Sequence, residues 1–222
     1  MSGAAITLGV MARAPIPGRC KTRLARAIGA ERAAGLYAAM LADRLAAISA
    51  LPVARRVVLA APEDDGPAAL RVLLPAGWDL VVQRGADLGE RLASAMIDAR
   101  AGGPGMMCLV DSDSPTLPLA RCLEGLMRTP ATSEVVLGPC EDGGYYLIGT
   151  RRPEPGVFEG IPWSTSGVLA ATRERCSALG LGVTELDPWY DIDEPEDLER
   201  LMNDAEGLSR APRTAAFLRG DR

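Results

Sequence analysis

The chain has 222 residues, of which 48% are hydrophobic and 4% aromatic, and its formal net charge is −5. The length and apolar content predict one folded domain with a core of aliphatic side chains. The negative net charge argues against a general nucleic-acid binder. No apolar run approaches the length of a membrane-spanning helix, and the N-terminus lacks a signal-peptide pattern, so we expect a cytoplasmic protein without membrane insertion.

Two residue types limit the chemistry that the chain can perform. It has no histidine, which excludes Ser-His-Asp and Cys-His nucleophile systems and HExxH metal sites. A general base must therefore be Asp, Glu, Tyr, Cys or Lys, and a metal must be held by oxygen ligands, which favours Mg²⁺ or Mn²⁺. The five cysteines form no CxxC pair, so we expect free thiols in a reducing cytosol rather than a disulfide framework.

Short apolar runs alternate with helical segments along the chain. Strands are expected at residues 5–11, 56–61, 79–83, 106–110, 134–138, 145–149 and 182–186. Helices are expected at residues 22–27, 31–49, 88–101, 118–127, 166–179 and 195–203. This alternation predicts an α/β fold, in which a mostly parallel sheet is flanked by helices and the site lies at the carboxyl ends of the strands. We expect one domain over residues 1–206 and a tail, residues 207–222, that is partly disordered because its periodicity is weak.

The loop after the first expected strand contains the only lysine of the chain. Lysine and arginine total 24, so Lys21 stands among 23 arginines. A lysine retained in such a sequence indicates a site that needs a compact ammonium rather than a planar guanidinium, although chance survival is the alternative. Since α/β proteins bind phosphate between a strand and the next helix, we expect Ala12, Arg13, Lys21 and Arg23 to bind an anionic small molecule.

A pair of carboxylates follows the buried run at 106–110. Asp111 and Asp113 stand two residues apart at the carboxyl end of this strand, where charged groups are costly without a cation. A divalent metal that bridges to a diphosphate would compensate them. The alternative is that Asp113 only caps the following helix.

Two further acidic segments follow strands or precede a helix. Glu141 and Asp142 come before Gly143 and Gly144, whose small size lets the backbone approach an acceptor closely, although Asp-Gly is also a common turn. Asp142 and Glu141 are thus candidate catalytic bases.

The second acidic segment contains Asp191 and Asp193, which alternate on an extended stretch. Asp193 and Glu196 match a capping box, whereas Asp191 has no capping role, so one of the two could complete the metal site. Before another helix, Gln83 could read a base edge, and Asp87 lies at a helix start that could face the nucleotide, although Asp87 equally fits an N-cap.

These segments occur in a fixed order over nearly the whole chain. They are Ala12-Arg13-Ala14-Pro15, Lys21-Thr22-Arg23-Leu24, Asp87-Leu88-Gly89-Glu90-Arg91, Asp111-Ser112-Asp113-Ser114-Pro115, Glu141-Asp142-Gly143-Gly144-Tyr145-Tyr146, Ile161-Pro162-Trp163-Ser164-Thr165 and Asp191-Ile192-Asp193-Glu194-Pro195. Together they resemble the bacterial DUF2064 group of GT-A-like proteins, which are described as nucleotide-diphospho-sugar transferases and include arsenosugar-biosynthesis glycosyltransferases.

The resemblance implies a GT-A fold and a site at which Lys21 and Arg23 contact the diphosphate of the donor. It also implies that Asp113 ligates a metal, with help from Asp191 or Asp193. The leading hypothesis is therefore metal-dependent glycosyl transfer from an NDP-sugar to a small acceptor, on which Trp163, beside Ser164, could stack.

Two other functions stay open at this point. The 2-phospholactate guanylyltransferases also carry a Lys-x-Arg-Leu loop, an acidic strand end, an Asp-Gly-Gly segment and a late Asp-x-Asp. They join an NTP to a phosphorylated acid and release pyrophosphate. A nucleotide-binding module without catalysis is the third possibility, which the intact set of aspartates disfavours.

Overall fold

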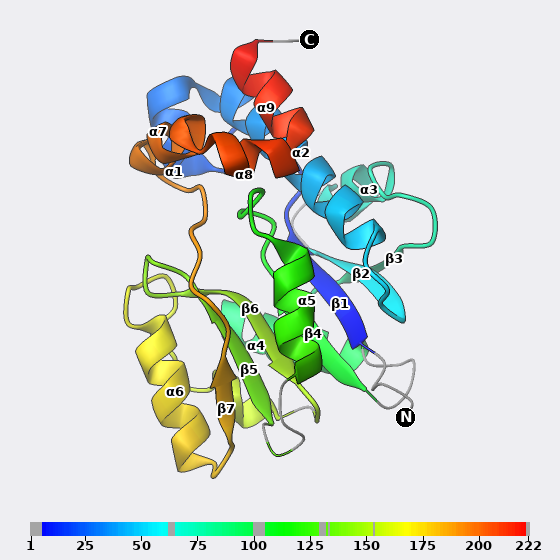
Figure 1. Ribbon diagram of the computed structural model, residues 1–222, viewed down its shortest axis with the longest axis vertical. Coiled ribbons are helices and arrows are strands. Elements are labelled where there is room, and N and C mark those ends of the chain that lie inside the picture. The colour runs from blue at the N-terminus through cyan, green and yellow to red at the C-terminus, as the bar shows by residue number, and fades with distance from the viewer. Residues whose placement is uncertain are drawn as a thin grey trace.

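The fold is built on one mixed sheet. The computed structural model describes residues 6–61, 65–99, 105–128, 132, 134–152 and 154–220. Its sheet has seven strands in the order β3-β2-β1-β4-β6-β5-β7 (Figure 1). The strands are β1 Ile6–Ala12, β2 Arg55–Ala60, β3 Asp79–Val82, β4 Met106–Val110, β5 Val135–Pro139, β6 Tyr145–Thr150 and β7 Val183–Glu185. β6 runs antiparallel to β4 and β5, whereas the other neighbours are parallel, as the predicted mostly parallel mixed sheet requires.

Helices cover both faces of this sheet. Their bounds are α1 Thr22–Ile28, α2 Ala30–Ser49, α3 Gly66–Arg71, α4 Leu88–Asp98, α5 Leu119–Arg128, η1 Pro155–Phe158, α6 Val168–Ala178, α7 Pro195–Asn203, α8 Ala205–Arg210 and α9 Pro212–Arg219. One core lies between the sheet and α2, α3 and α5, and the other lies between the sheet and α4, η1 and α6. β4 and β5 are buried along their whole length because both of their faces are covered.

The predicted strands and helices are all present, with ends shifted by a few residues. The first residue of the strand predicted at 5–11 and the last residues of the helix predicted at 88–101 lie outside the described residues. Four short elements, α3, η1, α8 and α9, are absent from the prediction. Three of them begin at or next to a proline, and each is too short to show a clear hydrophobic period.

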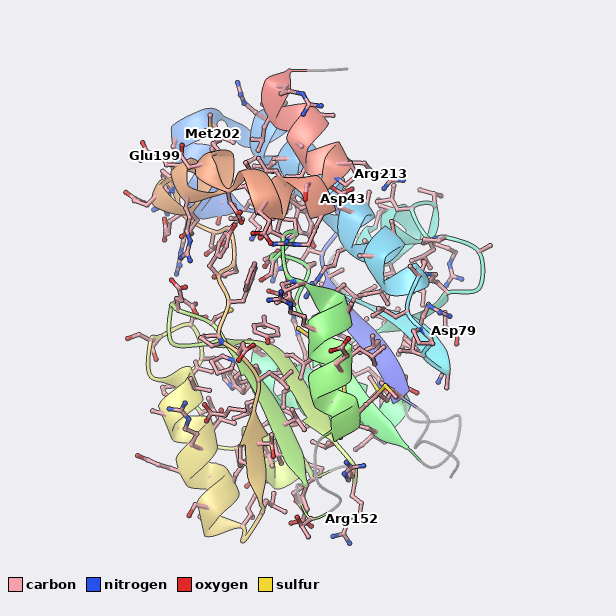
Figure 2. The ribbon with its side chains drawn as sticks, viewed as in Figure 1. Asp43, Asp79, Arg152, Glu199, Met202 and Arg213 are labelled. Carbon is pink, nitrogen blue, oxygen red and sulfur yellow. The ribbon has the colours of Figure 1, made fainter. Side chains whose placement is uncertain are left out.

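The C-terminal segment differs from its prediction. The sequence predicts partial disorder after residue 206, but residues 212–219 form α9, which packs on α2 (Figure 1). The Asp43 carboxylate on α2 is 2% exposed and accepts hydrogen bonds from the backbone N–H and the hydroxyl of Thr214 at 2.8 and 2.9 Å. Figure 2 shows Asp43 beside Arg213 at this junction, where the Arg213 N–H also donates to Asp43. A single buried carboxylate therefore satisfies the first donors of α9, a long-range contact that local periodicity does not reveal.

The topology brings several loops to one edge of the sheet. β1, β2 and β4 are parallel and end at this edge, and the antiparallel β6 begins there. The loops that follow β1, β4 and β5 and the segment before α7 therefore meet. Among the described residues, no helix is long and apolar enough to cross a membrane.

Candidate active site

Two adjoining cavities lie at this edge of the sheet. The basic cavity, of about 530 Å³, is bordered by the β1–α1 loop and carries Arg13, Arg19, Lys21, Arg23 and Arg91. The acidic cavity, of about 450 Å³, carries Asp111, Asp113, Asp142, Asp191 and Asp193. Asp113, Asp193, Arg23 and Ser164 line both cavities, so the two are continuous.

Lys21 lies at the junction of the two cavities. Its side chain is 6% exposed, and its ammonium lies 3.0 Å from Asp113 Oδ1 and 3.5 Å from Asp193 Oδ1. Burial of the ammonium would lower the pKa of Lys21, but the two carboxylates outweigh it and raise the pKa. Arg23 pairs with Asp193 at 3.2 Å from the exposed side. The structure therefore gathers two of the predicted phosphate-binding residues, Lys21 and Arg23, and two of the four predicted metal ligands into one charge cluster.

Tyr37, which the sequence analysis did not single out, lines the basic cavity and contacts the two loops around it. The Tyr37 hydroxyl accepts from the Arg13 N–H at 3.2 Å and lies 2.9 Å from Ser112 Oγ. The Lys21 ammonium lies 5.9 Å from the centre of the Tyr37 ring. Tyr37 thus links the loops that follow β1 and β4, and its ring lies near the Lys21 ammonium. Ala12, which also lines this cavity, is buried, and its carbonyl accepts from the Ala61 N–H in the sheet.

Gln83 and Asp87, both predicted to contact the nucleotide, differ in their placement. Gln83 lines the basic cavity, and its Nε2 donates to the Leu59 carbonyl at 2.7 Å. This bond fixes the amide. Asp87 is the N-cap of α4, where it accepts from the Glu90 N–H at 2.9 Å, and it lines neither cavity as the described residues define them. The capping interpretation of Asp87 is therefore the one that its contacts support.

Asp111 is held in a buried ion pair rather than beside Asp113. Arg44 on α2 is 1% exposed, and its guanidinium donates to Asp111 Oδ1 at 2.8 Å and to the Asp111 carbonyl at 3.2 Å. Ser114 Oγ donates to the other carboxylate oxygen of Asp111. Burial raises the pKa of Asp111, while Arg44 opposes the rise. Both oxygens of Asp111 have protein partners, which tie the loop that carries Asp113 to α2, and Asp111 also lines the acidic cavity.

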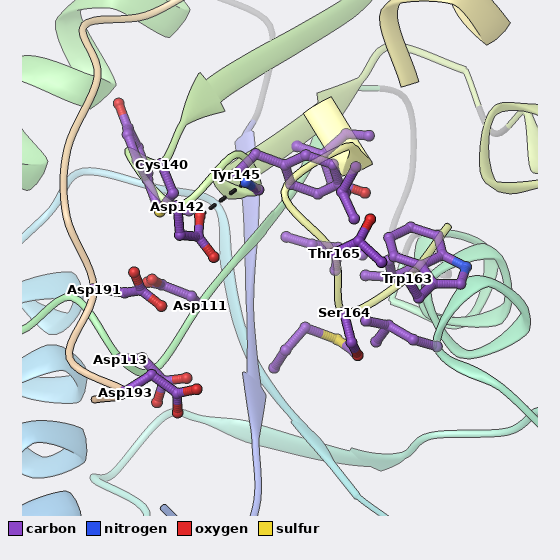
Figure 3. A pocket seen from close by; sticks show the side chains of 18 of the residues that line it. Asp111, Asp113, Cys140, Asp142, Tyr145, Trp163, Ser164, Thr165, Asp191 and Asp193 are labelled. Atoms are coloured by element: carbon purple, nitrogen blue, oxygen red, sulfur yellow. Dashed lines mark hydrogen bonds between the residues drawn. The ribbon is translucent and has the colours of Figure 1, made fainter. Parts of the chain in front are cut away.

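Asp142 and Asp191 form a separate group in the acidic cavity. One carboxylate oxygen of each aspartate and Cys140 Sγ all lie within 4.8 Å of one another. The Asp142 Oδ1 atom accepts from the Gly144 N–H at 2.8 Å. Burial, together with the charges of Asp142 and Asp111, raises the pKa of Asp191 to about 7. Figure 3 shows this group above the Asp113 and Asp193 pair along one side of the cavity.

The four predicted metal ligands are therefore divided among three environments. Asp113 and Asp193 face Lys21, Asp191 faces Asp142, and Asp111 faces Arg44. The capping box predicted for Asp193 and Glu196 lies one residue later: the Asp197 carboxylate accepts from the N–H groups of Asp193 and Glu194. This shift leaves the side chain of Asp193 available to the cluster.

Glu141, a predicted catalytic base, points away from both cavities. Its carboxylate receives two hydrogen bonds from Arg200 at the surface, where the Glu141 side chain is 53% exposed. The Arg200 guanidinium lowers the pKa of Glu141. Its chain neighbour Asp142 is the residue that lines the acidic cavity.

Of the predicted acceptor residues, Trp163 and Ser164 occupy the opposite side of the acidic cavity, whereas Gly144 lies beside Asp142. Trp163 and Ser164 line the cavity together with Thr165 (Figure 3). Gly143 has φ +90°, and a Cβ there would lie 2.1 Å from the Ser166 carbonyl oxygen. The close approach predicted for Gly143 is therefore made to the loop that carries Ser164, not to a ligand. Gly144 lines the cavity itself.

The residues that sequence reasoning missed are Tyr37, Arg44, Arg91 and Ser112. Tyr37 and Arg44 do carry a signal, since they fall in the buried stripe of α2 together with Met40, Leu41 and Leu45. An arginine in such a stripe indicates a buried carboxylate partner. Arg91 and Ser112 stand within two of the ordered segments quoted above, but neither residue was given a role from the sequence.

Comparison with known proteins identifies the family. The family model described as "Uncharacterized protein conserved in bacteria (DUF2064)" matches residues 44–165. The chain belongs to this family. A crystal structure from Desulfovibrio desulfuricans G20, of a protein named provisionally as a nucleotide-diphospho-sugar transferase, has a TM-score of 0.87 and 32% identity, over 97% of this chain and 94% of that chain. This match confirms the predicted single-domain GT-A fold.

A curated relative of this DUF2064 protein and a solved structure with a similar fold differ in their named reactions. The 2-phospho-L-lactate guanylyltransferase of Haloarcula marismortui is 30% identical over 195 residues, 85% of this chain and 83% of its own length. Glucosyl-3-phosphoglycerate synthase of Mycobacterium tuberculosis, crystallised with Mn²⁺, UDP and phosphoglyceric acid, has a TM-score of 0.51 and 15% identity, over 95% of this chain and 79% of that chain. The DUF2064 model covers Asp113, whereas Lys21 and Asp193 lie outside the residues it matches.

Proposed function

We propose that this DUF2064 protein is a metal-dependent transferase that uses a nucleotide-activated donor, and that it transfers a sugar from an NDP-sugar to a small acceptor. The observation that carries the proposal is the position of Asp113 and Asp193, where the basic cavity opens into the acidic one. A diphosphate fits the basic side, and a sugar fits a side lined by carboxylates and hydroxyls. The relatives with 30% and 32% identity, both named for nucleotide-dependent transfer, support the coarser statement.

The donor half supplies charge for a diphosphate. Lys21 is nearly dry, so its ammonium acts in a medium where electrostatic attraction is stronger than in water. Arg23 and Arg13 are more exposed and would hold the outer oxygens of the phosphates. The fixed amide of Gln83 leaves its oxygen as an acceptor for the nucleobase.

The Asp113 and Asp193 pair fits a hard divalent cation. One oxygen of each carboxylate already contacts the same cationic group, the Lys21 ammonium. Carboxylate oxygens are also suitable ligands for Mg²⁺ and Mn²⁺. Asp113 and Asp193 would hold the ion, which would neutralise the diphosphate as the bond to it breaks. The Mn²⁺ in the mycobacterial structure supports this choice of cofactor.

The acceptor half offers one accessible base. Asp142 is exposed to the acidic cavity, and only its Oδ1 atom is engaged by a backbone N–H, so Oδ2 can take the proton of an acceptor hydroxyl. Asp142→Asn should lower turnover strongly, whereas Glu141→Gln should not, because Glu141 is paired with Arg200 outside the cavity. Equal turnover in both variants would remove Asp142 from this role.

Nucleotidyl transfer is the second candidate, and the guanylyltransferase relative favours it. In that reaction a phosphorylated acid attacks the α-phosphate of an NTP, and pyrophosphate leaves. The same Lys21 and Asp113 would serve both reactions. The two reactions differ in the product that is released, which makes the choice between them measurable.

The experiment compares released products. The protein is incubated with Mg²⁺ or Mn²⁺ and either a panel of NDP-sugars or a panel of NTPs with phosphorylated acids, and nucleoside diphosphate and pyrophosphate are assayed in parallel. Diphosphate from one NDP-sugar, absent in Asp113→Ala, supports glycosyl transfer. Pyrophosphate from one NTP refutes it in favour of nucleotidyl transfer. If neither diphosphate nor pyrophosphate is released from any compound in either panel, both reactions are refuted.

A further inference from the structure

The acidic cavity has an unusual charge inventory. Five aspartates line it, and Arg23 is the one cationic residue among its described lining residues. Arg23 stands at the junction with the basic cavity and is paired with Asp193 at 3.2 Å. The part of the acidic cavity beyond this junction therefore presents carboxylates without a cationic side chain.

Three of the five aspartates have cationic partners. Asp111 pairs with Arg44 at 2.8 Å, and Asp113 and Asp193 share Lys21. In the described structure, neither of the other two, Asp142 and Asp191, has an ion-pair partner. Their carboxylates lie within 4.8 Å of each other and of the Cys140 thiol. Burial raises the pKa of Cys140, so this sulfur stays a neutral thiol and adds no positive charge.

The opposite side of the acidic cavity is neutral. It consists of Trp163 and the hydroxyls of Ser164 and Thr165 (Figure 3). The Thr165 hydroxyl already donates to the Pro162 carbonyl at 2.7 Å. Such a wall can stack on an uncharged ring and exchange hydrogen bonds with hydroxyls, but it offers no charge to an anion.

The two cavities thus present opposite charges, cationic side chains on the donor side and carboxylates on the acceptor side. Anion-binding groups gather in the basic cavity, with its five cationic residues, next to the place proposed for the diphosphate. A phosphorylated acid in the acidic cavity would lie against Asp142 and Asp191, which have no cationic partner in the described structure and repel an anion most strongly above pH 7, where Asp191, with its pKa raised to about 7, has lost its proton. Like charges placed together cost several kcal/mol, which is a means of rejecting a partner.

We propose that Asp142 and Asp191 select an acceptor that carries hydroxyl or amino groups and no anionic group, and that they exclude phosphorylated acids. The proposal rests on the proposed glycosyl transfer for its chemistry, but the selection itself is a property of binding. Hydroxyl and ammonium groups donate hydrogen bonds to the two carboxylates, which a phosphate cannot do.

The test uses matched probes with the full-length protein. Equilibrium binding is measured by calorimetry in the presence of UDP or GDP and Mg²⁺, for glucosamine against glucosamine 6-phosphate and for glycerol against glycerol 3-phosphate. 2-Phospho-L-lactate is the third anionic probe. We expect each unphosphorylated probe to bind at least about tenfold more tightly than its phosphorylated partner. The amine and polyol arms distinguish an ammonium from a hydroxyl as the recognised group.

Variants assign the selection to the two carboxylates. Asp142→Asn and Asp191→Asn should each reduce the preference between partners, while Glu141→Gln, a neighbouring carboxylate outside the cavity, should keep it. Because binding is measured without turnover, loss of catalysis in Asp142→Asn does not obscure the result. The selection can hold even where the product assay favours nucleotidyl transfer.

Three results would overturn the proposal. The first is equal or tighter binding of the phosphorylated probes. The second is a preference that Mg²⁺ reverses in favour of phosphate, since a second cation would then sit at Asp142 and Asp191. The third is the absence of saturable binding by every unphosphorylated probe.

Discussion

Replacement of Lys21 by methionine is the most informative perturbation of the charge cluster. Methionine keeps an unbranched side chain but removes the ammonium. The backbone φ at this position is 46°, in the left-handed region, and the cost of this conformation is similar for lysine and methionine. The Lys21 side chain is 6% exposed and its ammonium lies 3.0 Å from Asp113, so the ammonium acts where water screens little. Loss of one such transition-state contact costs about 10²–10³ in rate, equivalent to about 2.7–4 kcal/mol.

Mg²⁺ should stabilise the Lys21→Met variant even though the substitution lowers its catalytic rate. Without Lys21, the Asp113 and Asp193 carboxylates face each other, but they are 34% and 39% exposed, so water limits the cost to the order of 1 kcal/mol. Mg²⁺ no longer competes with the ammonium and should raise the melting temperature of Lys21→Met more than that of the wild type.

The assay measures kcat/KM for the donor and the melting temperature with and without Mg²⁺. Arg26→Met is the matched control, because Arg26 lies exposed on α1 and lines neither cavity as the described residues define them. Lys21→Arg should not restore the rate, since a planar fork does not replace a compact ammonium in a nearly closed position. Wild-type kcat/KM in Lys21→Met would refute the reasoning.

Three further outcomes are expected. Asp191 has its pKa raised to about 7, so the folded state holds its proton longer than the unfolded chain, and stability falls as pH rises from about 4 to 7; in EDTA, Asp191→Asn should melt higher than the wild type at pH 8 and no higher near pH 4. Arg44→Met should lower the free energy of unfolding by about 3–5 kcal/mol in urea titrations, and adding Asp111→Asn should recover much of that loss, whereas strict additivity would contradict the ion pair. Asp43→Ala should cost about 1–3 kcal/mol and expose α9 to trypsin, and unchanged proteolysis would show that α9 is held by its apolar contacts alone.

The sheet was predictable because its signals are local and repeated. The run at 106–110 is apolar throughout, as a strand buried on both faces must be, and the same holds for the strand at 135–139. The segments with candidate functional residues follow strand ends, so the sequence alone could place Lys21, Asp113 and Asp142 at one edge of the sheet. The short helices that begin with a proline could not be predicted, because one or two turns are too short to show a hydrophobic period in the sequence.

The division of the aspartates was not predictable from spacing. Asp111 and Asp113 stand two residues apart, as do Asp191 and Asp193, and only the position of Arg44 on α2 decides that Asp111 is a structural partner. Asp87 could equally have been an N-cap or a ligand contact, and the local hydrogen bond to Glu90 decides it. Partners that lie far away in the chain determine which member of an acidic pair remains available.

The contact between Lys21 and Asp193 joins residues 172 positions apart. Closing so long a loop is entropically costly, so contacts of this separation form late in folding. The central strands can therefore pair before the charge cluster forms, because the cluster also needs the segment around Asp193. A chain truncated just before Asp193 would keep the segments of all seven described strands yet lack one carboxylate of the charge cluster.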